Sequence, residues 1–289
     1  MKKFNIVILP VLYFFLLGFQ VDQWNQYDVP YVSTPYPVVE EMLRIAEVNK
    51  DDILYDLGCG DGRIVITAAK KFGCRGVGVD LDPQRIKESR ENAIKENVQN
   101  KVTFIQKDLF EAEISEATVV TLYLLSSINL ELRPKLLKDL KPGTRIVSHD
   151  FSMGEWEADE EKEVFVKSDR HMIYFWVVPA DVAGTWRWTL LENNSGMNYE
   201  IELRQKFNQV WAFQNLGSSK KSIEDFQLRG DKLSFTLREN MVEEDRVMFF
   251  EGQAKGKNIF GTVALKHGEK KEKKIWKARR LPSALAIKK

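Results

Sequence analysis

The sequence predicts an α/β domain built on a doubly wound parallel sheet, followed by a small all-β domain. Strand and helix patterns alternate from Ile53 to about Ser148, which is typical of parallel strands joined by crossover helices. Past Pro179 no helical period remains, and apolar residues alternate with polar ones in short runs. The chain has 289 residues, of which 44% are hydrophobic, so it is large enough for two packed cores.

Composition excludes several classes of protein. Lys and Arg number 43 against 42 Asp and Glu, so the net charge of +1 gives no reason to expect nucleic acid as a partner. The only cysteines are Cys59 and Cys74, which excludes a disulfide-rich scaffold and a four-cysteine zinc site. The three histidines lie far apart in the sequence, and we therefore expect no metal site: His149, His171 and His267.

Residues 1–21 have the composition of a signal peptide or membrane anchor. Two lysines precede a run from Ile6 to Phe19 that contains only apolar residues, Pro and Gly. The run is shorter than the roughly 17 to 25 residues of a spanning helix, and a clean cleavage site is missing. We expect an uncleaved anchor, with a cleaved signal as the alternative. The charge bias, with Asp22 and Asp28 after the run, favours export of both domains.

The first domain is expected over residues 29–180. A helix follows the proline-rich stretch that ends at Pro37, and a hairpin of two antiparallel strands closes the domain, because its loop is too short for a crossover. The expected strands are Ile53 to Asp56, Gly76 to Asp80, Val102 to Ile105, Thr118 to Leu124, Thr144 to Ser148, Glu163 to Lys167 and His171 to Val178. The helices between them are expected at Arg63 to Phe72, Pro83 to Glu96 and about Leu130 to Leu140.

The second domain is expected over residues 183–289 as a small closed barrel similar to lipocalin-like domains. Closure of the sheet would remove its exposed edges. Eight strands are predicted, at about Thr185 to Leu191, Asn198 to Arg204, Asn208 to Gln214, Ile223 to Arg229, Lys232 to Leu237, Arg246 to Gln253, Asn258 to Leu265 and Lys274 to Arg279. Its tryptophans suit a barrel core better than a ligand cup.

Residues 56–63, Asp-Leu-Gly-Cys-Gly-Asp-Gly-Arg, form a glycine loop between the first strand and the next helix. Gly58, Gly60 and Gly62 permit close backbone approach to a ligand. Asp56 would repel a pyrophosphate, so the loop favours a cationic, amine-bearing ligand over a dinucleotide. Asp80, at the tip of the following strand, can accept two hydrogen bonds from a ribose diol.

This loop and its spacing to Asp80 resemble those of the class I methyltransferases, which have a Rossmann-like seven-stranded sheet and use S-adenosyl-L-methionine. The resemblance covers about residues 29–178. It implies that Gly58 and Gly60 line the methionine part of the cofactor, that Asp80 holds the ribose, and that Asp108 lies by the adenine amino group. The expected cofactor site is completed by Asp56, Cys59 and Gly62. Cys59 has no His beside it, so packing is its expected role.

Four further motifs give a narrower resemblance. They are VPYVSTP at 29–35, VVTLYLL at 119–125, LRPKLL at 132–137 and VSHDF at 147–151. Together they resemble the protein-lysine methyltransferases that modify the c-subunit of mitochondrial ATP synthase and the adenine nucleotide translocase, and the prokaryotic relatives of these enzymes. The resemblance implies a protein lysine substrate, with membrane proteins among the candidates. The segment at Tyr123 lacks the Asn/Asp-Pro-Pro-Tyr motif of base-amine methyltransferases, which counts against nucleic acid.

Methyl transfer from a sulfonium needs a neutral nucleophile held close to the methyl group. An apolar, aromatic channel lowers the pKa of a lysine ammonium, and Tyr31 and Tyr36 are candidates to line that channel. Tyr123, His149 and Asp150 follow the fourth and fifth strands at the same rim. We expect these three to be catalytic residues, with His149 or Asp150 orienting or deprotonating the amine.

Two other functions stay open at this point. The chain could methylate a small molecule or lipid held in the barrel, or it could be a binding protein whose first domain only senses the cofactor. The membrane side also stays open, because the cofactor is made inside cells whereas the charge bias favours export.

Overall fold

The computed structural model describes residues 31–192, 195–239, 246–267 and 270–282. The hydrophobic segment predicted at residues 1–21 lies outside these ranges. Among the helices of the described ranges, none combines the length and apolarity needed to cross a membrane.

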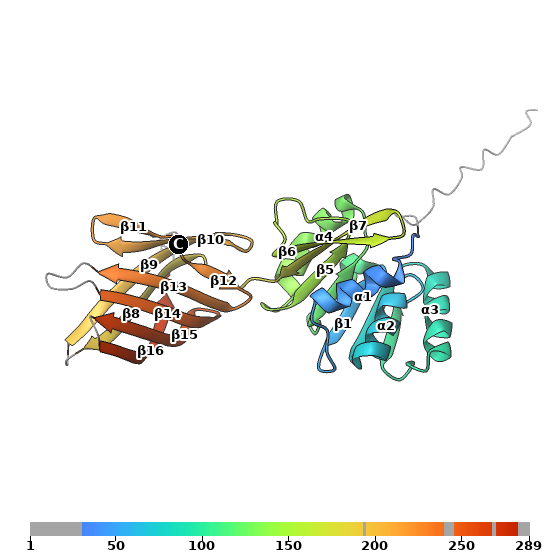
Figure 1. The fold of residues 1–289 in the computed structure, drawn as a ribbon, viewed down its shortest axis with the longest axis horizontal. Coiled ribbons are helices and arrows are strands. Elements are labelled where there is room, and N and C mark those ends of the chain that lie inside the picture. Colours follow the sequence, from blue (N-terminus) through green and yellow to red (C-terminus); the bar gives the residue numbers. More distant parts are fainter. Residues whose placement is uncertain (1–30, 193–194, 240–245, 268–269, 283–289) are drawn as a thin grey trace, which may run out of the picture. The chain divides into compact units, whose positions relative to one another are not determined.

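The first sheet has seven strands in the order β3-β2-β1-β4-β5-β7-β6 (Figure 1). The five strands from β1 to β5 pair in parallel, and β7 pairs antiparallel with both β5 and β6, as the short hairpin loop predicts. The strands are β1 (Ile53–Leu57), β2 (Arg75–Asp80), β3 (Val102–Gln106), β4 (Val119–Leu122), β5 (Arg145–His149), β6 (Glu160–Val166) and β7 (Asp169–Val177). The predicted seven-stranded, doubly wound sheet is confirmed.

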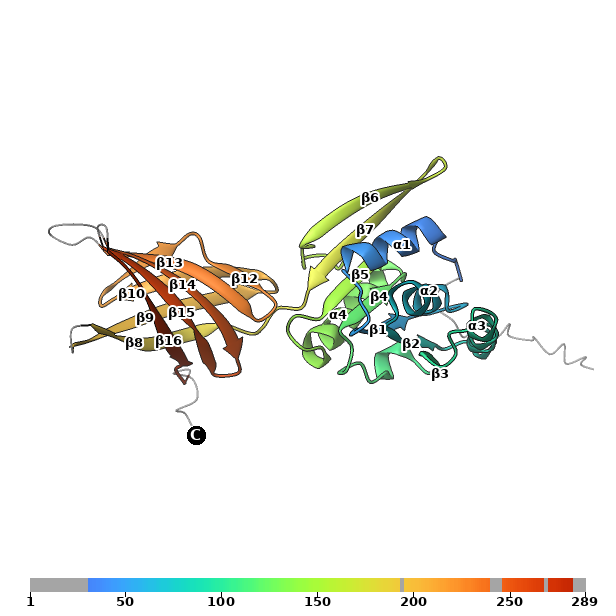
Figure 2. The ribbon, with the colours of Figure 1, turned by 60° about the horizontal axis from the view of Figure 1, so that its bottom comes forward.

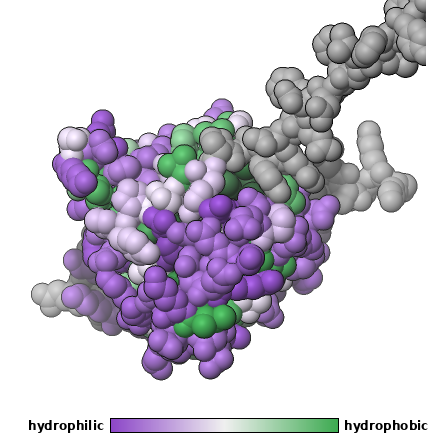
Figure 3. All heavy atoms as spheres, turned by 90° about the vertical axis from the view of Figure 1, so that its right-hand side faces the viewer, coloured by the Kyte–Doolittle hydropathy of each residue, from purple (hydrophilic) through white to green (hydrophobic). Residues whose placement is uncertain are grey.

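Helices lie on both faces of this sheet (Figure 2), and its central strands β1, β4 and β5 are buried on both sides. In β1, Leu54 packs into one core with α1, α2 and α3, whereas Tyr55 and Leu57 pack into a second core with α4. The helices are α1 (Tyr36–Ile45), α2 (Arg63–Phe72), α3 (Pro83–Lys95) and α4 (Ser126–Asp139), with a short 3₁₀ turn η1 (Leu109–Glu111). The side of the domain that carries α3 is mostly hydrophilic (Figure 3).

The second sheet is entirely antiparallel and has nine strands in the order β11-β10-β9-β8-β16-β15-β14-β13-β12. Its strands are β8 (Gly184–Glu192), β9 (Ser195–Lys206), β10 (Gln209–Leu216), β11 (Ser219–Ile223), β12 (Gln227–Arg229), β13 (Lys232–Glu239), β14 (Arg246–Lys255), β15 (Asn258–His267) and β16 (Lys270–Arg280). The prediction of a closed eight-stranded barrel is wrong, because one predicted strand is broken and the sheet stays open. The strand expected at Ile223 to Arg229 is broken into β11 and β12, which are the two ends of a curled, open sheet.

The inner face of this curled sheet is a packed aromatic core. Phe235 and Phe250 stack with their ring centroids 4.7 Å apart, and Trp188 and Trp276 meet them edge-on. All four side chains are buried. These rings fill the space that a lipid or small-molecule cup would need. The core predicted for the tryptophans is confirmed for Trp186, Trp188 and Trp276, which are buried, and is wrong for Trp211, which is 49% exposed.

We predict that Phe235→Ala lowers the free energy of unfolding of the second domain by about 3 to 5 kcal/mol, the usual cost of removing a buried aromatic ring. Phe235 is fully buried and contacts four other rings. Urea denaturation followed by tryptophan fluorescence measures the change, and Phe249→Ala, which removes a 42% exposed ring on the adjacent strand, is the control. Equal losses in the two variants would contradict the packed core.

Candidate active site

The candidate site lies where the strand order reverses between β1 and β4. Both strands are parallel and in register, with Leu57 opposite Val79 on one side and Leu122 on the other. In open α/β sheets, ligands bind at the carboxyl ends of the strands that flank such a switch point. The segments that follow β1, β2, β4 and β5 all leave the sheet at this edge. The topology therefore gathers the glycine loop, Asp80, Tyr123 and His149 at one edge.

The glycine loop is held to β2 through its backbone. The amides of Gly58 and Cys59 both donate to the carbonyl of Val79, at 2.8 and 3.0 Å. Gly58 and Gly60 have positive φ angles of 83° and 52°, which side chains disfavour. A Cβ atom on Gly60 would also lie 2.3 Å from the ring of Tyr31. The loop thus needs glycine for its conformation and for close approach.

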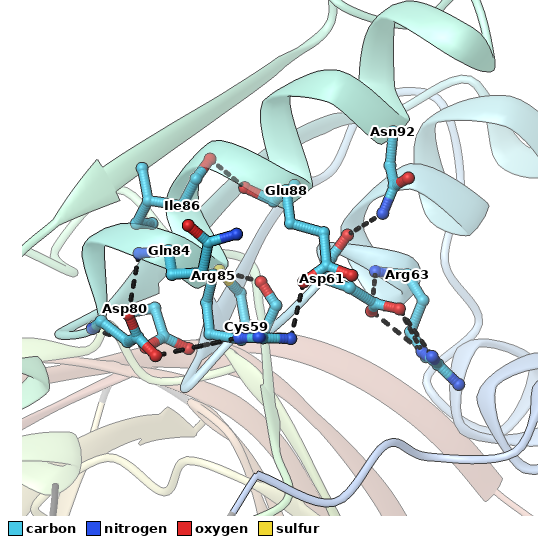
Figure 4. Close-up of polar contacts among 12 residues, drawn as sticks. Cys59, Asp61, Arg63, Asp80, Gln84, Arg85, Ile86, Glu88 and Asn92 are labelled. Carbon is cyan, nitrogen blue, oxygen red and sulfur yellow. Dashed lines mark hydrogen bonds and ion pairs between the residues drawn. The ribbon is translucent and has the colours of Figure 1, made fainter.

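Asp80 joins the loop to the end of β2. Its Oδ2 atom accepts a hydrogen bond from the Gly60 amide at 2.8 Å, and its Oδ1 atom accepts one from the Asp82 amide at 3.0 Å (Figure 4). Each carboxylate oxygen has a second lone pair, so Asp80 can still accept from a ligand diol. Asp82 has a different task, because its side chain caps α3 by accepting from the amide of Gln84.

Asp56 and Cys59 are more buried than a ligand-facing role suggests. Asp56 is 2% exposed and accepts a hydrogen bond of 2.7 Å from the Thr121 hydroxyl on β4. Burial raises the pKa of Asp56 to about 7, and the nearby carboxylates of Asp80 and Asp61 add to that rise, whereas the Thr121 hydrogen bond opposes it. Burial also raises the pKa of the Cys59 thiol. Both side chains support the loop from within, which is the packing role expected for Cys59.

Asp108 follows β3 and caps the 3₁₀ turn η1, where its Oδ1 atom accepts from the Phe110 amide at 2.9 Å. Its other carboxylate oxygen is not used by that cap. The proposed contact of Asp108 with the adenine amino group stays a prediction.

Residues 31–35, which we call the cover segment, run from the glycine loop to the end of β5. Tyr31 packs against Gly60, and the guanidinium of Arg85 lies 4.5 Å from its ring centroid. Further along, Arg63 donates to the carbonyl of Thr34 at 3.0 Å while its guanidinium also pairs with Asp61 (Figure 4). Burial alone would raise the pKa of Asp61, but the hydrogen bonds from Arg63 lower it below its usual value.

The predicted tyrosine channel is not assembled as one wall. Tyr36 begins α1, is 57% exposed and lies under Arg63. Tyr31 contacts the glycine loop instead. In the described part of the chain, the aromatic partners of Tyr123 are His149, at 3.9 Å between ring centroids, and Phe151, at 6.0 Å.

His149 is fully buried at the end of β5, with both ring nitrogens occupied. Its Nδ1 atom lies 3.1 Å from the Thr34 hydroxyl, and its Nε2 atom lies 2.9 Å from His171 Nδ1 and 3.1 Å from Asp150 Oδ2. Burial lowers the pKa of His149 to about 4; the Asp150 carboxylate opposes that shift and His171 adds to it. The prediction that His149 deprotonates the amine is therefore not supported, because its nitrogens do not reach the surface.

Asp150 and His171 complete this group, which we call the His149 cluster. Asp150 has a positive φ of 59°, and its Oδ1 atom accepts from the Met172 amide at 2.7 Å. The sequence alone does not indicate His171 as a site residue, because 21 positions separate it from Asp150 and 22 from His149. The two histidines meet because β7 pairs with β5, with Ile173 opposite His149. The predicted hairpin, whose second strand begins at His171, is the sequence feature that could have indicated this pair.

Fold and site together define a class I methyltransferase that uses S-adenosyl-L-methionine. The residues present fit that cofactor, because the loop carries glycine at positions 58 and 60 with positive φ angles and Asp80 ends β2 with one lone pair left on each carboxylate oxygen. Comparison with known proteins gives the family. The model of the ANTKMT methyltransferase domain matches residues 56–160. A protein-lysine N-methyltransferase of Saccharolobus islandicus is 50% identical over 151 residues, which are 52% of this chain and 94% of that protein. This chain belongs to the same family of methyltransferases.

Other relatives are more distant or differently named. The adenine nucleotide translocase lysine N-methyltransferase of Mus musculus is 32% identical over 131 residues, which are 45% of this chain and 56% of that protein. A solved structure named as an RNA methyltransferase from Salinibacter ruber, in complex with S-adenosyl-L-homocysteine, is 53% identical. The alignment covers 52% of this chain and 96% of that one, with a TM-score of 0.49.

We predict that Asp80→Ala weakens binding of S-adenosyl-L-methionine by about 5- to 150-fold, since it removes a half-buried hydrogen-bonding partner worth about 1 to 3 kcal/mol. Isothermal titration calorimetry measures the change. Asp82→Asn is the matched control, because it alters a carboxylate two residues away and keeps an oxygen to cap α3. Unchanged affinity in Asp80→Ala, or an equal loss in both variants, would contradict the assigned role of Asp80.

A second prediction follows from Asp56. Its native pKa of about 7 exceeds the ordinary value of 3.8, so between these pH values the native chain holds a proton that the unfolded chain has lost. The free energy of unfolding therefore falls as pH rises through this window, by on the order of 1.4 kcal/mol per pH unit. Asp56→Asn cannot ionise and can keep a bond to Thr121.

We expect the cofactor-free Asp56→Asn variant to match the parent chain near pH 4 and to be more stable by a few kcal/mol near pH 8. Urea denaturation at the two pH values measures this difference. A stability difference that does not change with pH would show that Asp56 ionises normally in the folded chain.

Proposed function

We propose that this chain transfers a methyl group from S-adenosyl-L-methionine to the ε-amine of a lysine in a protein substrate. The observation that carries the proposal is the 50% identity to a protein-lysine N-methyltransferase over 94% of that protein's length. That span takes in 151 residues of this chain. The packed aromatic core of the second sheet supports the same choice, because it removes the cup that a lipid substrate would need.

The residues of the glycine loop and Asp80 hold the cofactor in this proposal. When bound, S-adenosyl-L-methionine supplies an electrophilic methyl group: the lysine nitrogen bonds to that carbon as the sulfur–carbon bond breaks, and the nitrogen loses a proton to water. The protein's task is then to hold a neutral amine in line with the methyl group. Leu124 brings the Tyr123 segment to the loop, since a Cβ on Gly58 would lie 2.9 Å from its side chain.

Tyr123 and Phe151 form the aromatic wall that receives the amine. Their rings are stacked with centroids 6.0 Å apart, and Tyr123 is half-buried. An ammonium that leaves water for such a wall has a lowered pKa, which yields the neutral amine. Burial, and then the charge of Asp150, raise the pKa of Tyr123, so the phenol stays neutral at physiological pH and can orient the amine by a hydrogen bond.

The test is transfer of labelled methyl from the cofactor to separate pools of protein, RNA and lipid from one cell extract. We expect label in the protein pool, and methyl-lysine after complete hydrolysis of that pool. Label confined to RNA or to lipid would overturn the lysine assignment while leaving the methyltransferase assignment intact. Asp80→Ala is the control, because its weaker cofactor binding should lower transfer to every pool when the cofactor is kept near the parent chain's Kd.

We predict that Tyr123→Ala lowers kcat for lysine methylation by about 10²-fold, by removing the wall that positions the amine. Tyr123→Phe keeps the ring and should lose less, so the difference between the two variants isolates the phenol hydroxyl. The Kd of S-adenosyl-L-methionine, measured by calorimetry, should stay within about twofold in both. Full activity in Tyr123→Ala would contradict a substrate wall at this position.

Membrane attachment through residues 1–21 is part of this proposal. The apolar run behind Lys2 and Lys3 supports it, and a protein substrate in or near the membrane would then be within reach. Flotation with lipid vesicles should retain the full chain and release a chain that begins at Asp22. Equal recovery of both chains would refute attachment.

A reporter active only in an oxidising compartment, fused after Lys289, determines the side of the membrane on which the chain lies. A silent reporter is the result that an intracellular enzyme predicts.

A further inference from the structure

Three ligand-type atoms of the His149 cluster converge on one point. His149 Nε2 and His171 Nδ1 are 2.9 Å apart, and Asp150 Oδ2 lies 3.1 Å from the first and 3.3 Å from the second. Each atom comes from a different side chain, and the cluster is buried at His149 and open to solvent at Asp150, whose side chain is 28% exposed. The three atoms thus form a compact triangle at the end of β5.

Hydrogen bonds alone do not satisfy this triangle. A neutral imidazole has one N–H and one lone pair, so each of the two nitrogens that face the centre either donates or accepts. If one of these nitrogens donates to the other, the accepting nitrogen also faces the Asp150 oxygen at 3.1 or 3.3 Å, and acceptor meets acceptor. If both donate to Asp150, two N–H groups meet at 2.9 Å. With Asp150 as the carboxylate, every arrangement of the two neutral imidazoles leaves one unfavourable edge.

A divalent cation would satisfy all three edges at once. Atoms bound at about 2.1 Å from Zn²⁺ stand about 3.0 to 3.4 Å apart, for angles between about 90° and about 109° at the metal. The observed separations of 2.9 to 3.3 Å are close to this range. We propose that His149, Asp150 and His171 form a Zn²⁺-type metal site, bound through Nε2, Oδ2 and Nδ1, with water at the remaining position.

The surroundings hold the three ligands as the outer partners of metal sites do. The Thr34 hydroxyl lies 3.1 Å from His149 Nδ1, where it can accept a hydrogen bond from an Nδ1–H and so leave the Nε2 lone pair for the ion. The Met172 amide donates to Asp150 Oδ1 and leaves Oδ2 for the ion.

Such an ion would join three parts of the chain. His149 lies on β5, His171 lies on β7, and Thr34 brings the cover segment to the same point. Two imidazoles and a carboxylate, with a place left for water, are a ligand set that zinc accepts. The site is separate from the lysine proposal, because binding of the ion can be measured without any methyl transfer.

The experiment is titration of the full chain with Zn²⁺ after removal of metals by a chelator. We expect one equivalent of Zn²⁺ to bind and the melting temperature to rise with it. His171→Ala should weaken binding by at least about 100-fold. Thr34→Val removes only the outer hydroxyl and should weaken it by about 10- to 100-fold. Calorimetry gives the affinities, and Co²⁺ absorption reports the geometry.

His267→Ala is the matched control, because it removes the remaining histidine, on β15, and leaves the cluster intact. It should bind Zn²⁺ as the parent does. Binding of S-adenosyl-L-methionine confirms that each variant is folded. No stoichiometric Zn²⁺ binding by the parent chain, or equal affinity in His171→Ala, would overturn the metal site and show that the cluster is a hydrogen-bonded triad.

Discussion

The hydrogen bond from the Gly60 amide to the Asp80 carboxylate is the contact on which the site depends. It ties the loop after β1 to the end of β2, and the amides of Gly58 and Cys59 add two bonds to the carbonyl of Val79. Because the loop is fixed in this way, α2 begins at Arg63, directly after Gly62, and the Arg63 side chain reaches the cover segment. The position of the loop, the start of α2 and the anchoring of the cover segment all depend on the end of β2.

The cover segment connects the two halves of the site. Tyr31 contacts the glycine loop at Gly60, and Thr34 contacts His149 at the end of β5. Pro35 ends this segment, and its fixed φ angle lowers the entropy lost when the segment is held at the sheet edge. The cofactor cradle and the aromatic wall at Tyr123 are therefore coupled through four residues of backbone. A metal ion at the His149 cluster would hold His149 more firmly, and so strengthen the contact of the cover segment with the end of β5 through Thr34.

The sequence predicted the features that depend on local patterns of residues. The helix from Arg63 to Phe72 has the predicted bounds, since Gly62 and Gly73 both adopt the left-handed conformation at its ends. The strand expected at Ile223 to Arg229 shows where prediction from local patterns fails. Its alternation continues through Phe226, but the chain turns there and leaves two sheet edges. Alternation of residue types reports which face is buried, and it does not report whether the ladder of hydrogen bonds continues.

The candidate site shows the same difference between features set by local patterns and features set by contacts between distant residues. Glycine spacing and the acidic strand end indicate the glycine loop and its link to β2 from the sequence, because the glycines act through their own backbone and Asp80 acts from its place at the end of the strand. The partnership of His149 with His171 depends on the pairing of β5 with β7, and the burial of Asp56 depends on the Thr121 hydroxyl of a neighbouring strand. Contacts between residues far apart in sequence need the register of the strands, which single-sequence patterns leave open.

The most direct test of the account is a crystal structure of this chain with S-adenosyl-L-homocysteine bound. The account predicts that the ribose hydroxyls donate to the Asp80 carboxylate, that the methionine part lies over Gly58 and Gly60, and that the sulfur faces Tyr123. A cofactor bound elsewhere, or bound at this edge without contact to Asp80, would contradict it.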